Sequence, residues 1–169
     1  MTLSMSQLTL PALTRGLRIL SELLTKGEAW AAANGVDPAE LTAGRLFEDM
    51  APLTAQVQSV SDTSKFAIAR ISGVAGPTMA DDEVTFADLQ ARIAKTLAYL
   101  ESVDPSTLDG TEGKTIELKF PNGEFSMTGS AYLTGFVLPN FYFHLVTAYD
   151  ILRHKGVPLG KLDYLGAIA

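Results

Sequence analysis

The first segment of the chain alternates apolar and polar positions with the period of an α-helix. Its leucines follow one another at intervals of three and four residues, at positions 10, 13, 17, 20 and 24. Charged residues lie between them, so the leucines form one face of a long amphipathic helix. We expect this helix to run from about Ser6 to Asn34, with Gly35 as its stop and Pro11 either near the first turn or at a kink.

A short helical turn and two more long helices should follow. The short turn is expected at Pro38–Ala43, after the N-cap residue Asp37. The second long helix should then extend from Pro52 to the break at Gly73, and a turn-rich link should lead to the third. The third helix should begin after a capping box at Thr85 and end near Val103.

The pattern changes to a period of two from residue 115 onward. Polar and apolar residues alternate over residues 115–120 and 124–128, and Asn122-Gly123 between them is a strong turn signal, so a β-hairpin is predicted. A two-stranded hairpin is marginally stable alone. Its apolar face should therefore lie on the helices or on a partner chain, and that face consists of Ile116, Leu118, Phe120 and Phe125.

The segment from Ser130 to Lys155 is apolar on nearly all sides, which is typical of a buried helix. A kink is expected at Pro139, and Gly156 is a suitable C-cap. Together with the three amphipathic helices before it, this segment predicts an all-α fold. We expect one domain over residues 1–169, an up-and-down four-helix bundle with a small β-hairpin before the last helix.

Composition and charge narrow the range of functions. The 169 residues are 47% hydrophobic and 19% charged, which suits one globular domain with a substantial core. The formal net charge is −6 and no segment concentrates lysine or arginine, so a nucleic-acid partner is not expected. The absence of cysteine excludes disulfides, thiolate ligands and a cysteine nucleophile. It also fits a reducing compartment, and we expect a cytoplasmic protein.

Residues 131–152 are long and apolar enough to raise the question of a membrane span. Pro139, Asn140, His144 and Asp150 lie inside this stretch, and each polar group would cost about 1 to 3 kcal/mol in hydrocarbon on insertion scales. The N-terminal residues also lack the basic flank and unbroken apolar run of a signal peptide. We therefore expect no membrane partner.

Asn140 and His144 are the most distinctive polar residues of the last helix. They are four residues apart, so they share one face, which is the spacing of two metal ligands on a helix. Zinc usually takes three protein ligands, and an asparagine amide is a poor one. His154 is the only other histidine, and ten residues further along it points well away from His144. A buried histidine that hydrogen-bonds Asn140, Asp62 or the backbone is the simpler interpretation.

The second helix supplies the other candidate residues. A further metal ligand would have to be Asp62 or Gln56. Asp62 either pairs with Lys65 at the surface or points inward and orients His144 as a base. The catalytic candidates are thus His144 and Asp62, and the ligand-binding candidates are His144, Asn140, Asp62 and Gln56. A metal, if one is bound, would take His144, Asp62 and Asn140.

Three segments carry a resemblance to a known family. They are MAPLTAQVQSVSDTSKFAIARISG, TFADLQARIAKTLAYLESV and LPNFYFHLVTAYDILRHKGVPLGKLDYLG. They resemble the bacterial domain-of-unknown-function family 1993, within the DinB/YfiT-like superfamily, which includes metal-binding members. The resemblance spans essentially the full chain. It implies an up-and-down bundle with a long crossover between its second and third helices, commonly in a homodimer.

The resemblance also implies where a metal site would lie. Metal-binding members carry one histidine on the second helix and two, four residues apart, on the last. His144 matches the second of that last pair, while Asn140 stands at the first, and no histidine lies between Gln56 and Asp62. Two of three ligand positions are thus replaced.

Three functional hypotheses follow. The first is a polar pocket around His144 that binds a small molecule or a partner without a complete metal site and without a cofactor. The second is a metal-dependent or thiol-dependent hydrolase or transferase that uses His144 with polar residues of the second helix, its metal being zinc, nickel or iron. The third is a structural homodimer module without pocket chemistry.

Overall fold

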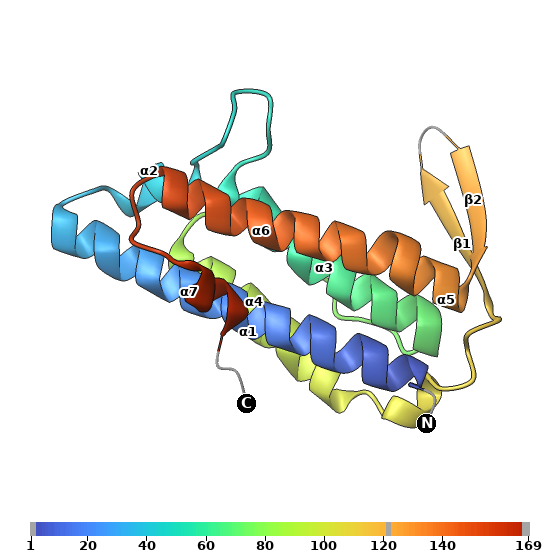
Figure 1. Ribbon diagram of the computed structural model, residues 1–169. Helices are drawn as coiled ribbons and strands as arrows, with labels where there is room; N and C mark the ends of the chain where they lie inside the picture. Colours follow the sequence, from blue (N-terminus) through green and yellow to red (C-terminus); the bar gives the residue numbers. More distant parts are fainter. Residues whose placement is uncertain (1–2, 121–122, 167–169) are drawn as a thin grey trace.

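Four long helices lie side by side and make up most of the molecule (Figure 1). The structure, a computed structural model, describes residues 3–120 and 123–166. The long helices are α1 (Met5–Asn34), α3 (Leu53–Ser72), α4 (Phe86–Ser102) and α6 (Leu138–His154). Each agrees closely with a helix that the hydrophobic pattern predicts, although the expected last helix is divided into more than one element.

Local sequence signals account for the starts of α1 and α4. The Ser4 hydroxyl accepts a hydrogen bond from the Gln7 backbone while the Gln7 side chain accepts one from Ser4, a capping box that begins α1. Thr85 and Asp88 form the predicted capping box of α4. Pro11 lies inside α1, beyond its first turn.

The chain direction of the four helices is up, down, down, up. Gln56 of α3 pairs with His144 of α6, and Arg70, further along α3, pairs with Tyr132, which precedes α6, so this pair of helices is antiparallel. By contrast α3 and α4 run the same way, so the simple alternation of an up-and-down bundle does not hold for them. Residues 73–85 make this possible, because an extended link of that length reaches about 43 Å and α3 is only about 30 Å long.

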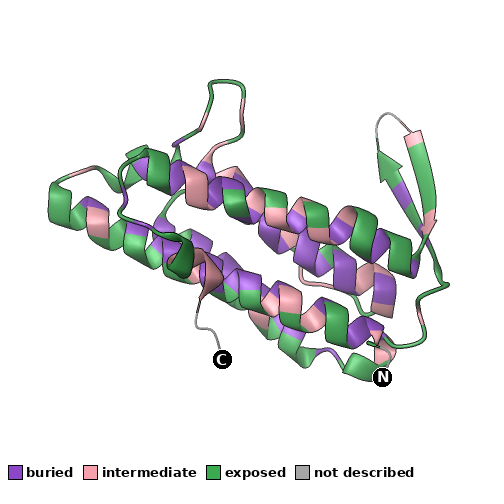
Figure 2. Ribbon diagram, viewed as in Figure 1, coloured by how far each residue is buried: buried purple, intermediate pink, exposed green. Residues whose placement is uncertain are grey.

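Apolar side chains from all four long helices form one continuous core. Figure 2 shows buried positions along each of these helices. Buried positions form a stripe on each of the four long helices, α6 included. The expectation that the last helix is buried on nearly all sides is wrong, because Phe143 on its outer face is 59% exposed. In the part of the chain that the structure describes, no helix combines the length and apolarity needed to cross a bilayer.

The hairpin extends from one end of the helices beside α5 (Gly129–Tyr132) (Figure 1). Strands β1 (Thr115–Phe120) and β2 (Gly123–Thr128) are antiparallel, with Leu118 opposite Phe125. The predicted apolar face is only partly covered, since Ile116 and Leu118 are buried while Phe125 is 50% exposed. Asn122, half of the predicted turn dipeptide, lies outside the described residues.

A π-helical turn, η2 (Leu133–Val137), separates α5 from α6. The Leu138 N–H bonds the Leu133 carbonyl, five residues back, and the backbone stays right-handed throughout. The irregularity therefore begins one turn before Pro139, where a kink is predicted. A widened turn relieves the contact between a proline ring and the carbonyl four residues earlier, which here belongs to Gly135.

Short helical elements complete the described part of the chain. Helix α2 (Pro38–Thr42) begins after Asp37 as predicted, and the 3₁₀ turn η1 (Pro105–Thr107) follows α4. The pattern does not predict α7 (Lys161–Leu165), because five residues are too few to establish a helical period. Helix α7 lies against α1, where Lys26 pairs with Asp163.

Candidate functional site

Three polar contacts join α3 to the α5–α6 segment at regular intervals. The contributing residues on α3 are seven apart, about two helical turns or 10 Å, so they lie on one face. Their hydrogen bonds are 2.7, 2.7 and 2.9 Å long. In order along α3, the pairs are Gln56 with His144, Thr63 with Asn140, and Arg70 with Tyr132.

The first contact fixes the tautomer of His144. The Gln56 side-chain nitrogen donates to the Ala51 carbonyl at 3.0 Å, so its amide oxygen is directed to His144 Nδ1 at 2.7 Å. An amide oxygen only accepts hydrogen bonds, so Nδ1 carries the proton. The other ring nitrogen, Nε2, then holds a lone pair, and among residues 3–120 and 123–166 no side chain or backbone group hydrogen-bonds it.

Burial keeps this imidazole neutral. Desolvation lowers the pKa of His144 below its ordinary value of 6.5. At neutral pH the side chain is therefore an N–H donor to Gln56 and an acceptor at Nε2.

Asn140 contacts α3 rather than His144. Its amide nitrogen donates to Thr63 Oγ1 at 2.7 Å, and its amide oxygen is left for another donor. The predicted hydrogen bond between Asn140 and His144 is not formed, because both side chains reach across to the neighbouring helix. Gln56, one of the four ligand-binding candidates, is the residue that orients His144.

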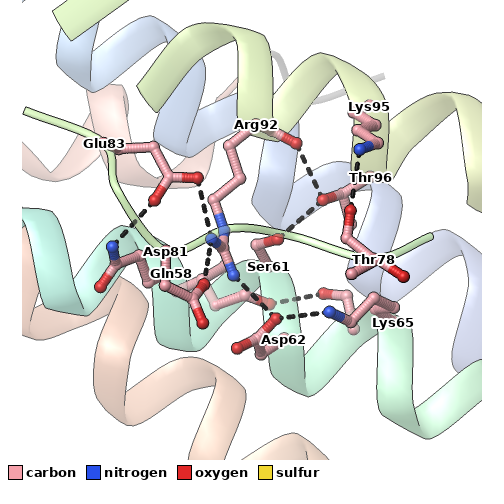
Figure 3. A network of polar contacts seen from close by, with 12 residues as sticks. Gln58, Ser61, Asp62, Lys65, Thr78, Asp81, Glu83, Arg92, Lys95 and Thr96 are labelled. Atoms are coloured by element: carbon pink, nitrogen blue, oxygen red, sulfur yellow. Dashed lines mark hydrogen bonds and ion pairs between the residues drawn. The ribbon is translucent and has the colours of Figure 1, made fainter. Parts of the chain in front are cut away.

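Asp62 does not orient His144. Its carboxylate accepts a hydrogen bond from Arg92 Nη2 at 2.7 Å and forms an ion pair with Lys65 Nζ at 2.9 Å (Figure 3). The expected pairing with Lys65 is present, but it is not a surface pair, because Lys65 is buried. With both cations on its carboxylate, Asp62 is an acceptor for Arg92 and Lys65 and not for an imidazole.

The three contacts border a cavity of about 290 Å³. Its lining combines aromatic rings with hydroxyl, amide, imidazole and guanidinium groups. The lining residues are Ser59, Asp62, Thr63, Phe66, Arg70, Phe120, Tyr132, Phe136, Asn140 and His144. His144, Asn140 and Asp62 are thus brought to one cavity, as the sequence suggests, while Gln56 supports His144 from behind it.

The candidates from the sequence do not include the far end of this cavity, where Arg70 and Tyr132 lie. Arg70 is nevertheless separated from Gln56 by two intervals of seven residues. That spacing marks a shared helix face and could have indicated Arg70. Tyr132 carried no comparable signal, since its position depends on the π-helical turn that follows it.

The donor atoms around His144 do not suit a transition-metal ion. Within the described residues no three histidine, cysteine or acidic side chains are grouped closely enough to hold one. The Gln56 oxygen is used by Nδ1, and Asp62 is held by two cations. One imidazole nitrogen and an asparagine oxygen fall short of the three ligands that zinc normally takes.

The chain is similar to known proteins in both sequence and structure. The model of a family described as "Domain of unknown function (DUF1993)" matches residues 5–165. A crystal structure at 1.83 Å resolution, of a DinB family member protein from Shewanella denitrificans, is similar with a TM-score of 0.88 and 38% sequence identity. That similarity covers 96% of this chain and 92% of the other. No curated protein shows significant sequence similarity to the chain.

Proposed function

Because the chain belongs to the DUF1993 family, whose description names no activity, we propose a function from the cavity between α3 and α6. The cavity binds a small molecule through neutral His144 and does not need a resident metal ion. The observation that carries this proposal is the hydrogen-bond chain from Ala51 through Gln56 to His144, which leaves Nε2 as an acceptor.

The size and lining of the cavity support a small ligand. Its volume of about 290 Å³ is near the lower end of small-molecule sites, and it combines apolar surface with a few placed polar groups. Nε2 of His144 and the amide oxygen of Asn140 both accept hydrogen bonds. A ligand with a hydroxyl or N–H group therefore satisfies this end of the cavity better than one without a donor.

A second candidate function uses the same nitrogen as a general base. A neutral imidazole whose other nitrogen is bonded to a fixed acceptor can take a proton from a bound substrate. Gln56 then stabilises the ring orientation, and no metal takes part in this step. The observation that favours this candidate is again the fixed tautomer of His144.

A titration with 4-methylphenol tests the binding proposal. The protein has two histidines, so nitrogen resonances of both can be followed by NMR, and exposed His154 on the same helix is the internal control. We expect 4-methylphenol to shift the Nε2 resonance of His144 and to leave His154 unchanged. The ether 4-methylanisole, which lacks the donor, should bind about five- to tenfold more weakly.

Two results would contradict the proposal. Equal affinity for the phenol and the ether would show that Nε2 accepts no hydrogen bond from the ligand. No response of His144 up to the solubility limit of the phenol would show that the cavity does not bind ligands of this kind.

Metal analysis separates the proposal from the metal-enzyme hypothesis. Protein purified without chelators should hold less than about 0.1 equivalent of zinc, nickel or iron, because a single imidazole binds these ions weakly. About one equivalent per chain, lost in the variant His144→Ala, would support a metal centre instead.

A further inference from the structure

Arg70 occupies the end of the cavity opposite His144. It lies in the last turn of α3, and its Nη1 donates a hydrogen bond to the Tyr132 hydroxyl at 2.9 Å. Its guanidinium lies 5.0 Å from the ring centre of Phe66 and 5.9 Å from that of Tyr132. These contacts hold the planar group in place at the cavity, because guanidinium groups pack well on aromatic faces.

The positive charge of Arg70 is not offset by a neighbouring carboxylate. No ion pair in the described part of the chain includes Arg70, whereas the other two cations near the cavity, Arg92 and Lys65, both bind Asp62. The carboxylate of Asp62 is therefore directed to Arg92 and Lys65 and not to Arg70. Lys114 bonds the Arg70 carbonyl at 2.9 Å and adds positive charge at this end of α3.

The remaining donors of Arg70 suit a carboxylate. Nη1 is directed to a neutral hydroxyl, which leaves Nη2 and Nε as the side-on pair that commonly binds both oxygens of a carboxylate. A phosphate dianion carries two negative charges and would meet a single guanidinium here, which is a poorer match in charge.

Aromatic rings surround this position. Tyr132 stacks on Phe136 with ring centres 5.8 Å apart, and Phe120 of the hairpin lies 6.0 Å from Phe136. Phe66 lines the cavity from the α3 side. The apolar body of a ligand can therefore pack beside the charged group.

We propose that the Arg70 end of the cavity binds the carboxylate of a small organic acid whose aromatic or aliphatic body packs on Phe66, Phe120 and Phe136. This assignment rests on the proposed small-molecule site and names its ligand class. It requires selectivity for the acid over a neutral molecule of the same shape, and it requires that selectivity to depend on Arg70.

Calorimetry with two matched probes tests this assignment. The probes are 3-phenylpropionate and 3-phenylpropan-1-ol, which differ at the polar end. The wild-type protein should bind the acid at least about tenfold more tightly than the alcohol, and Arg70→Gln should bring the two affinities close together. Arg70→Lys keeps the charge but loses the planar pair of donors, so it should fall between the two.

Two controls accompany these variants. Lys119→Gln removes one positive charge from an exposed hairpin residue that does not line the cavity, and it should leave the selectivity unchanged. Tyr132→Phe removes the hydroxyl that holds Arg70 and should weaken acid binding more than alcohol binding. Melting curves identify any variant that fails to fold, and the comparison of acid with alcohol on the wild type needs no variant.

The outcomes distinguish this assignment from the proposed function. If 4-methylphenol shifts His144 but the wild type binds acid and alcohol equally, the small-molecule site stands and the carboxylate assignment is wrong. If Arg70→Gln leaves the selectivity intact, the acid binds elsewhere and the assignment is also wrong. If neither the phenol nor the acid binds, both proposals fail.

Discussion

At the scale of single residues, a hydrogen bond between two helices determines the chemical role of His144. Its spacing from Asn140 indicates a pair of metal ligands, yet the structure directs the two side chains to different residues of α3. Gln56 determines which ring nitrogen carries the proton. This arrangement makes His144 an acceptor at Nε2.

His144 should also make stability depend on pH. Burial lowers its folded-state pKa below 6.5, so the unfolded chain takes up a proton first as the pH falls. The stabilisation is fully present above pH 6.5 and is lost as the pH falls through the folded-state pKa. In urea unfolding, the stability of the wild type relative to His144→Leu should therefore decrease from pH 7.5 to pH 5.5. A difference that is constant or increases on acidification would contradict the lowered pKa.

At the scale of elements, the link between α3 and α4 is held by a buried cation. The side chain of Arg92 is 1% exposed and pairs with Asp62 of α3 at 2.7 Å and with Asp81 and Glu83 of the link at 2.5 and 2.9 Å (Figure 3). Burial lowers the pKa of Arg92, but these carboxylates outweigh that effect and raise it. The link is thus fixed to both helices by one charged group.

Replacing Arg92 should be costly. Arg92→Met leaves Glu83 partly buried without its cation, and the loss of a buried ion-pair partner typically costs about 3 to 5 kcal/mol. The matched variant Arg18→Met removes an exposed pair with Glu101 and should cost less than about 1 kcal/mol. Urea unfolding of both variants measures the difference. Similar losses in the two would show that the Arg92 network adds little to stability.

Close packing between α1 and α6 gives a second test at this scale. A Cβ atom at Gly16 would lie 2.4 Å from the ring of Phe141, whereas at Gly135 it would meet no atom within 4 Å. Gly16→Ala should destabilise by about 1 to 3 kcal/mol, because the core must shift to accept the methyl group. Gly135→Ala should be neutral or stabilising by up to about 1 kcal/mol. If thermal unfolding shows equal effects, the helices do not approach as closely as described.

The long elements could be predicted from the sequence because their signals are local. Leucine periodicity, capping boxes and strand alternation all act within a few residues. The π-helical turn, the Arg92 network and the partner of His144 could not, because each depends on how separate segments meet. Arg70 illustrates both cases. Its spacing from Gln56 can be read from the sequence, but its contact with Tyr132 depends on where the α5–α6 segment lies.

At the scale of the whole molecule, family membership and the fold agree. The chain belongs to the DUF1993 family and shares its architecture with the DinB family structure. The parallel α3 and α4, joined by residues 73–85, correspond to the crossover that the resemblance implies. The homodimer that it also implies stays a prediction.

Light scattering after size exclusion tests the dimer. A dimer would have twice the chain mass of 18.1 kDa at micromolar concentration. Phe125, half exposed on the hairpin, is among the large apolar side chains that the single chain leaves uncovered. A monomer mass throughout the accessible concentration range would contradict the prediction and exclude the structural homodimer module.

We infer that His144 is a neutral acceptor whose Nδ1 proton is fixed by Gln56, and that it needs no metal ion. Long-range proton–nitrogen NMR of the two histidines at about pH 7 tests it directly, since the two neutral tautomers and a metal-bound ring give different nitrogen shifts. We predict a protonated Nδ1 and an unprotonated Nε2 for His144, unchanged by addition of a chelator, and a mixture of tautomers in Gln56→Leu. A protonated Nε2 in the wild type, or a His144 spectrum that changes when metal is removed, would contradict this assignment of the His144 tautomer.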